Sequence, residues 1–263
     1  MDIEFMKKIN HEYQQELESY LKKSPSPYEQ MKRVHEQMIE AKFTLKGKPF
    51  PTFLKPLLMP KACRNLFEQT TFHLTNAIEK VANLFFESED YHMLFEMAPR
   101  DKELSMIDPR YPRRVIVGRL DAFYSQEDGL KFLEFNCDSP SGMGWHDALV
   151  RIFAETEVCK TFGSKYRLEF DTFLDSLCSM FLTKYREFGG KKEHPVIAVI
   201  CNEESSIRND VELIIQHFNQ KRNVKTIFAD PRDGAYDGER FQMRGEEVDI
   251  IYQIGRASCR ERV

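Results

Sequence analysis

The stretch 115–136 reads Val-Ile-Val-Gly-Arg-Leu-Asp-Ala-Phe-Tyr-Ser-Gln-Glu-Asp-Gly-Leu-Lys-Phe-Leu-Glu-Phe-Asn. Two strand-like runs, Val115 to Tyr124 and Leu130 to Asn136, flank a short polar segment that contains a glycine. Alternating apolar residues on both sides of such a segment are typical of a β-hairpin. The sequence therefore predicts two antiparallel strands joined by a turn over residues 125–129.

The same alternation predicts the register of this hairpin. If residues 127–128 close the turn, Asp121 lies opposite Glu134. Arg119 then lies opposite Asn136. These four polar side chains share one face, because strand side chains alternate with a period of two. A slip of one residue would turn the polar side chains of the second strand into the core, so the pattern favours this register. The predicted core face consists of Leu120, Ala122, Tyr124, Leu133 and Phe135.

The polar face of the predicted hairpin allows two interpretations. The carboxylates of Asp121 and Glu134, with the amide oxygen of Asn136, suit Mg²⁺, which takes oxygen ligands. The neighbouring Arg119 offers a planar fork of donors for a carboxylate or a phosphoryl group. Exposed strand faces, however, also carry cross-strand ion pairs that bind nothing. The hairpin alone therefore leaves a metal site and a surface ion pair as alternatives.

The residues around the hairpin also resemble a known family. Residues 118–123 (Gly-Arg-Leu-Asp-Ala-Phe) and 133–142 (Leu-Glu-Phe-Asn-Cys-Asp-Ser-Pro-Ser-Gly) are similar to the signature of circularly permuted ATP-grasp proteins, which include glutathionylspermidine synthases. Shorter matches resemble the pre-ATP-grasp portion of that family, at 229–233, 236–240 and 248–252. The resemblance covers roughly residues 114–252, whereas the first hundred residues match only as a helical lead-in.

The resemblance implies roles for eight residues. The Mg²⁺ ligands would be Asp121, Glu134 and Asn136. Arg119 would act in catalysis, by steadying the substrate carboxylate and the acyl phosphate as negative charge builds up. The substrate-binding residues would be Ser139 and Ser141 for the carboxylate, and Glu203 and Glu204 for the amine or peptide. The two glutamates follow a predicted strand, where open α/β sheets commonly bind ligands.

The function implied by the resemblance is ATP-dependent ligation of a small-molecule or peptide carboxylate to an amine, through an acyl phosphate, with Mg²⁺ and ATP as cofactors. In the family, the lysines that hold the nucleotide phosphates lie nearer the C-terminus. This sequence contains neither a Gly-x-x-x-x-Gly-Lys-Ser/Thr motif nor a Gly-x-Gly-x-x-Gly motif. We therefore expect an N-terminal fragment of a ligase that is inactive alone.

Two other functions remain open at the sequence level. The first is a non-catalytic substrate-binding module with the same fold. The second is a metal-dependent nuclease that uses Asp121 and Glu134. Asn136 occupies the position where such a nuclease needs a lysine, and the chain is acidic, so the nuclease is the weaker alternative.

The last ten residues, 254–263, read Ile-Gly-Arg-Ala-Ser-Cys-Arg-Glu-Arg-Val and show no apolar periodicity. They can be encoded by a DNA sequence that resembles a common sequencing adapter read in one frame. We therefore expect the native sequence to end near Tyr252 and exclude the tail from the fold prediction. A natural basic tail is the alternative.

The predicted fold class is α/β (α+β), an incomplete ATP-grasp fold. Val196 to Cys201 is almost entirely apolar, as a buried parallel strand is, and Ser206 could cap a following helix. The expected parts are a helical region over 1–100, a hairpin with helices that carries the metal and carboxylate site over 101–190, a pre-ATP-grasp-like α/β unit over 195–253, and the tail over 254–263.

Composition limits the partners. The chain has 38 basic and 42 acidic residues, a formal charge of −4. Leaving out the tail removes three arginines and one glutamate, which gives 35 basic and 41 acidic residues and a charge of −6. This balance disfavours nucleic acid as a partner. The sequence shows no signal peptide and no long apolar span, and its six cysteines lack metal-type spacing. We therefore expect a cytoplasmic protein without a membrane partner.

Overall fold

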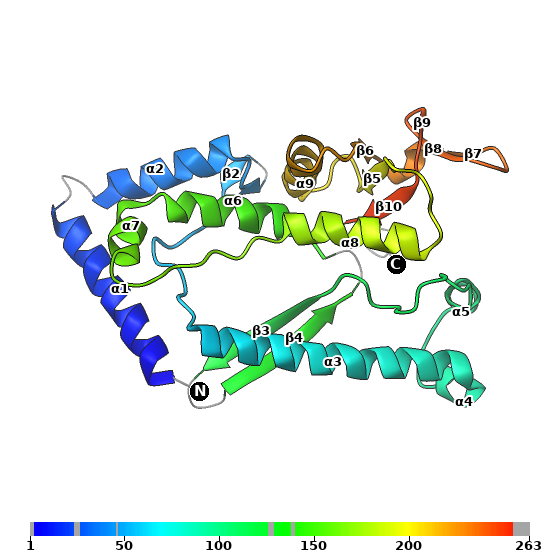
Figure 1. The fold of residues 1–263 in the computed structure, drawn as a ribbon, viewed down its shortest axis with the longest axis horizontal. Coiled ribbons are helices and arrows are strands. Elements are labelled where there is room, and N and C mark those ends of the chain that lie inside the picture. The colour runs from blue at the N-terminus through cyan, green and yellow to red at the C-terminus, as the bar shows by residue number, and fades with distance from the viewer. Residues whose placement is uncertain (1–2, 24–26, 46, 126–128, 138–139, 255–263) are drawn as a thin grey trace.

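The structure is a computed structural model that describes residues 3–23, 27–45, 47–125, 129–137 and 140–254. It combines helices with four small sheets, so the broad α/β prediction is confirmed for the described part of the chain. In Figure 1 the long helix α3 (Lys61–Glu87) runs along the lower edge, with the hairpin of β3 (Arg119–Ser125) and β4 (Gly129–Asn136) above it.

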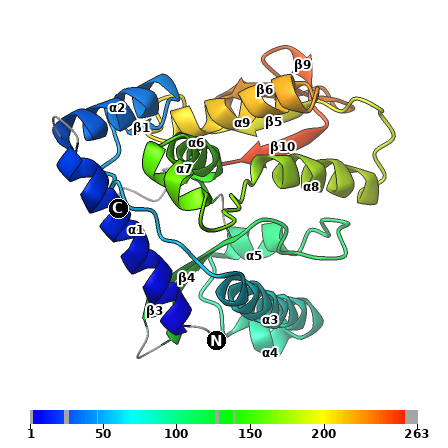
Figure 2. The ribbon, with the colours of Figure 1, turned by 60° about the vertical axis from the view of Figure 1, so that its left-hand side comes forward.

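The N-terminal helices form one end of the molecule. α1 (Ile3–Lys23) packs on α7 (Glu157–Gly163), and α2 (Pro27–Glu40) packs on α6 (Met143–Ala154), as both ribbon views show (Figures 1 and 2). Each packs through an apolar stripe at helical spacing, because an amphipathic helix buries one face. The smaller elements of the first half are β1 (Thr44–Leu45), β2 (Lys48–Pro49), α4 (Glu89–His92) and α5 (Pro99–Ser105).

The hairpin register is confirmed around the polar face and differs towards the turn. Arg119 pairs with Asn136, and Asp121 pairs with Glu134. A β-bulge follows, so that Ala122 pairs with residue 132 in place of Leu133. Leu133 is 66% exposed and Ala122 is exposed as well, so the prediction that these two residues lie on the core face was wrong. The turn residues 126–128 lie outside the described residues.

The first strand also begins later than predicted, at Arg119. The preceding backbone is held by α3. The Glu79 carboxylate accepts the N–H groups of Arg114 and Val115, at 2.6 and 3.1 Å. Because these N–H groups already have a partner, the segment joins the helix and not the sheet.

The C-terminal unit is a three-stranded sheet in the order β10-β5-β6, with all pairs parallel. One face, which includes Val199 and Phe228, packs against two helices. The other face, which includes Ala198 and Ala229, packs against a small antiparallel sheet. The elements are α8 (Leu174–Glu187), β5 (Ile197–Ile200), α9 (Arg208–Lys221), β6 (Thr226–Ala229), η1 (Pro231–Asp233), β7 (Gly234–Tyr236), β8 (Phe241–Met243), β9 (Glu246–Glu247) and β10 (Ile250–Gln253).

A buried carboxylate from α9 caps the start of α6. Asp210 is fully buried, and its two oxygens accept the N–H groups of Gly142 and Trp145 at 2.6 and 2.9 Å. These are donors in the first turn of α6, which no partner within that helix could satisfy. The contact joins the α/β unit to the loop that follows the hairpin.

The start of α9 differs from the sequence prediction. Ile207, and not Ser206, occupies the N-cap position, and no side chain caps the helix there. The hydrogen bonding between β10 and β5 continues for one residue after Gln253, the last residue of β10. The N–H of Ile254, the first residue of the predicted tail, donates to Ile200 O at 3.0 Å, and its side chain is fully buried. Residues 255–263 lie outside the described residues.

No helix within the described ranges combines the length and the apolar character needed to cross a membrane.

Candidate metal and carboxylate site on the hairpin

The polar face of the hairpin carries two hydrogen-bonded pairs of side chains, one on each strand. The guanidinium of Arg119 binds both carboxylate oxygens of Asp121, Nε to Oδ1 at 2.7 Å and Nη2 to Oδ2 at 3.2 Å. On the neighbouring strand, the Asn136 amide Nδ2 donates to Glu134 Oε1 at 3.0 Å. The four residues predicted to form one face are therefore together, and each contacts another of the four.

These contacts set the charge state of the face. The hydrogen bonds from Arg119 hold the pKa of Asp121 below its ordinary value, and they raise the pKa of Arg119 in turn. Both side chains remain substantially exposed, at 45% and 33% for Arg119 and Asp121. Asp121 is thus a carboxylate whose charged form is favoured, and solvent and ligands can reach it.

The loop after β4 approaches the same face. The third guanidinium nitrogen of Arg119, Nη1, donates to the carbonyl of Ser141 at 2.9 Å. The backbone on either side of Ser141 is anchored: Pro140 O accepts the Tyr252 hydroxyl at 3.2 Å, and Gly142 is bound to Asp210. The backbone of Ser141 is therefore beside the polar face, whereas Ser139 lies outside the described residues. That Ser141 binds a substrate carboxylate stays a prediction.

The two predicted amine-site glutamates lie elsewhere, in the loop after β5. Glu203 donates its N–H to Asp230 at 3.0 Å, and its carboxylate lies 3.5 Å from Arg244. Glu204 is exposed and donates its N–H to Asn202 at 3.0 Å. Both are at the carboxyl end of the parallel sheet, where the sequence placed them. In the described part of the chain, no hydrogen bond or ion pair connects them to the hairpin face.

The oxygen atoms on the polar face of the hairpin are of the kind that a hard cation binds. It offers carboxylate oxygens from Asp121 and Glu134 and an amide oxygen from Asn136, which are ligands that Mg²⁺ prefers. As the side chains stand, Arg119 takes both Asp121 oxygens, so a cation would have to share or displace that guanidinium. Among the described residues, no group of three or more His, Cys, Asp and Glu side chains is placed to hold a metal. An ion here would therefore depend on the amide.

A cavity beside this loop was not anticipated from the sequence. It has a volume of about 380 Å³ and lies against β10. Its lining includes Arg114, Cys137, Pro140, Lys184, Tyr185 and Tyr252. These residues come from well-separated parts of the chain, so no local pattern could have brought them together.

Comparison with known proteins adds no assignment to this geometry. No protein-family model matches the chain, and no curated protein matches its sequence.

Proposed function

We propose that this chain carries the metal and carboxylate side of an ATP-grasp-type ligase that joins a carboxylate to an amine. The observation that supports the proposal most is the hairpin register. It sets Asp121, Glu134 and Asn136 on one face, with the Arg119 guanidinium among them. An arrangement of oxygen donors beside a cationic fork matches the needs of acyl-phosphate chemistry, in which negative charge builds up on phosphoryl oxygens.

In this proposal the side chains of the hairpin have two roles, cation binding and orientation of the substrate. Mg-ATP, when bound, supplies the phosphoryl group that activates the carboxylate. Asp121, Glu134 and Asn136 hold the cation. Arg119 orients the substrate carboxylate through its fork and stabilises charge on the acyl phosphate. The proposal places the reaction in the cytoplasm, which supplies Mg-ATP.

Metal binding is the first test, because it needs only the present chain. Mn²⁺, as a paramagnetic substitute for Mg²⁺, is titrated against the protein and followed by electron paramagnetic resonance. We expect Glu134→Gln and Asp121→Asn to weaken binding, since each removes a charged oxygen ligand. Glu96→Gln, which removes an exposed carboxylate outside the hairpin, is the matched control. Equal Mn²⁺ binding by all four proteins would exclude the metal assignment.

Turnover is the second test. ATP hydrolysis that depends on a carboxylate and an amine is measured on the longest product of this reading frame. We expect Asp121→Ala and Glu134→Ala to abolish it while circular dichroism stays unchanged. If the protein binds Mn²⁺ and a carboxylate but turns over no ATP in any form, the non-catalytic binding module becomes the better description.

A further inference from the structure

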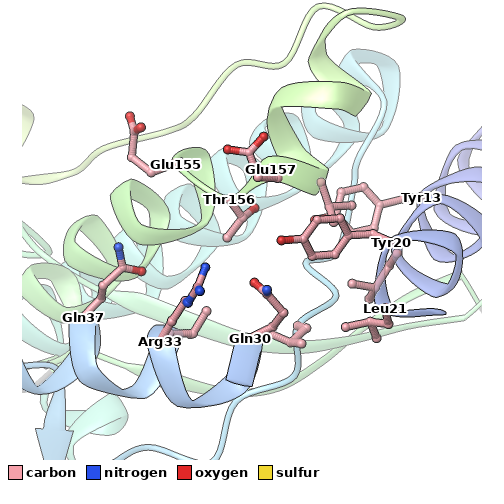
Figure 3. A pocket seen from close by; sticks show the side chains of 13 residues that line it. Tyr13, Tyr20, Leu21, Gln30, Arg33, Gln37, Glu155, Thr156 and Glu157 are labelled. Atoms are coloured by element: carbon pink, nitrogen blue, oxygen red, sulfur yellow. The ribbon is translucent and has the colours of Figure 1, made fainter. Parts of the chain in front are cut away.

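A second cavity lies at the other end of the molecule, between α1, α2 and the turn that joins α6 to α7 (Figure 3). Its volume is about 200 Å³. Ligand pockets for drug-sized molecules span roughly 300–1,000 Å³, so this cavity suits a smaller metabolite. No residue of the hairpin or of the sheet lines it.

Three polar side chains converge in this cavity. Figure 3 shows Tyr20, Gln30 and Arg33 pointing toward the same space, in front of Thr156. Within the described ranges, none of the three has a hydrogen bond or an ion pair with another side chain. The guanidinium of Arg33 can only donate, and the phenol and the amide can donate as well. The convergence therefore favours an anionic acceptor.

The rest of the lining limits the kind of anion. Part of the lining is aliphatic, with Leu17, Leu21, Val34, Leu54 and Val158. The lining also includes Glu155 and Glu157. Glu155 is neutralised by Lys160 at 2.9 Å, whereas Glu157 takes part in no ion pair with a described residue. The negative charge of Glu157 repels a doubly charged anion, such as a phosphate or a dicarboxylate, more strongly than a monocarboxylate. The aliphatic lining favours a ligand with an apolar tail.

We propose that this cavity binds a small monocarboxylate with an aliphatic tail. Arg33, Gln30 and Tyr20 receive the carboxylate, and the tail packs against the aliphatic residues of the lining. Two sources share this chemistry, a simple short-chain acid and a free aliphatic amino acid, whose ammonium group would face Glu157. The site is separate from the hairpin, so it does not depend on the proposed ligase function.

The test uses three probes of matched shape, which are titrated into the full chain by isothermal calorimetry at fixed ionic strength. 4-Methylpentanoate carries the carboxylate, 4-methylpentanamide is its neutral counterpart, and L-leucine adds the ammonium group. We expect saturable binding of 4-methylpentanoate and at least about tenfold weaker binding of the amide, because charge-assisted hydrogen bonds are the stronger ones. L-Leucine binding more tightly than 4-methylpentanoate would identify an amino acid as the source, and weaker binding would identify the simple acid.

Two variants of neighbouring residues locate the site. Arg33→Gln removes the cation of the cavity and should weaken 4-methylpentanoate binding at least about tenfold. Lys32→Gln removes the same charge from the same helix, at a residue that does not line the cavity and lies 3.9 Å from Glu36. It should bind like the wild type. Equal affinities of the two variants, equal binding of acid and amide, or no saturable binding of any probe would overturn the proposal. Both positions are exposed, so both variants should fold.

Discussion

Single buried carboxylates hold distant backbone segments together in this molecule. Asp210 accepts two N–H groups of the α6 start, Asp147 accepts those of Phe173 and Leu174, and Glu79 accepts those of the segment before β3. In each case one side chain accepts hydrogen bonds from two backbone N–H groups in buried or partly buried surroundings. These residues are therefore expected to be more sensitive to substitution than the charged residues of the surface.

Asp210→Ala should destabilise the fold by about 2–4 kcal/mol, because it leaves two buried N–H groups unsatisfied and opens a cavity. The measurement is urea denaturation followed by circular dichroism. Glu204→Ala, which removes an exposed carboxylate, should cost less than about 0.5 kcal/mol. Comparable losses in the two variants would show that the cap contributes little.

The loss of unfolding free energy caused by Asp210→Ala should also depend on pH. Burial raises the pKa of Asp210 above its ordinary value, in spite of the backbone N–H groups that favour the charged form. The folded state then holds a proton that the unfolded chain has released, so the stabilising contribution is complete below the unfolded pKa and is lost as pH rises through the folded pKa. The wild-type advantage over Asp210→Ala should therefore be larger near about pH 4 than near about pH 8. An advantage that grows with pH would mean that the N–H groups outweigh burial.

Gly144 is the second residue at the crowded start of α6. A Cβ there would lie 2.8 Å from the carbonyl oxygen of Asp210 and 2.8 Å from Leu213 Cβ. Gly144→Ala should therefore cost about 1–3 kcal/mol of unfolding free energy. Gly163→Ala is the matched control, because that helical glycine has only Leu168 within reach, at 3.8 Å. A thermal denaturation in which both variants match the wild type would refute the crowding.

At the scale of elements, the hairpin shows what a periodic pattern can predict. Period-two alternation correctly paired Asp121 with Glu134, because one face is polar and the other is apolar. It could not show the bulge, since inserting Leu133 leaves the residues on its C-terminal side in the predicted register. The late start of β3 was equally hidden, because its cause is Glu79, which lies 35 residues from Arg114.

Glu79→Gln tests this attachment of α3 to the segment before β3. The amide keeps one acceptor oxygen and places an NH₂ group against the second backbone donor, so we expect a loss of about 1–3 kcal/mol. Hydrogen exchange should accelerate at Arg114 and Val115 before it does in the core. Glu87→Gln, at the exposed end of the same helix, should leave those amides unchanged. Unaltered exchange in both variants would mean that other contacts hold the segment.

The start of α8 has a similar explanation. The sequence from Leu168 to Phe188 predicts a helix, but α8 begins at Leu174. Asp147 of α6 binds the N–H groups of Phe173 and Leu174 and so fixes the first turn there. A cap that comes from another element cannot be recognised in the local sequence. For this reason the presence of a helix was predicted better than its boundaries.

At the scale of the whole molecule, Tyr252 connects the parallel sheet to the loop that follows the hairpin. Its hydroxyl donates to Pro140 O at 3.2 Å, across 112 residues of sequence. Tyr252→Phe should cost about 0.5–1.5 kcal/mol, the usual net contribution of one hydrogen bond. Tyr28→Phe, at a side chain that is 73% exposed, should be neutral in the same chemical denaturation. A neutral Tyr252→Phe would show that packing alone joins the two parts.

The candidate sites differ in how far the sequence could reveal them. The hairpin face was predictable because its members are two residues apart on adjacent strands. The cavity near Arg33 was not, although Gln30, Arg33 and Gln37 share one helix face by their spacing. A helix face shows which residues lie together, but not that the α6–α7 turn closes the space above them. That closure is set by tertiary packing.

The bidentate contact between Arg119 and Asp121 has a thermodynamic consequence for the hairpin. A cation competes with the guanidinium for the Asp121 oxygens, whereas a carboxylate ligand competes with Asp121 for the guanidinium. Each ligand therefore releases the group that the other needs. Binding of the two should be mutually reinforcing, and by linkage the same factor that strengthens the cation also strengthens the acid.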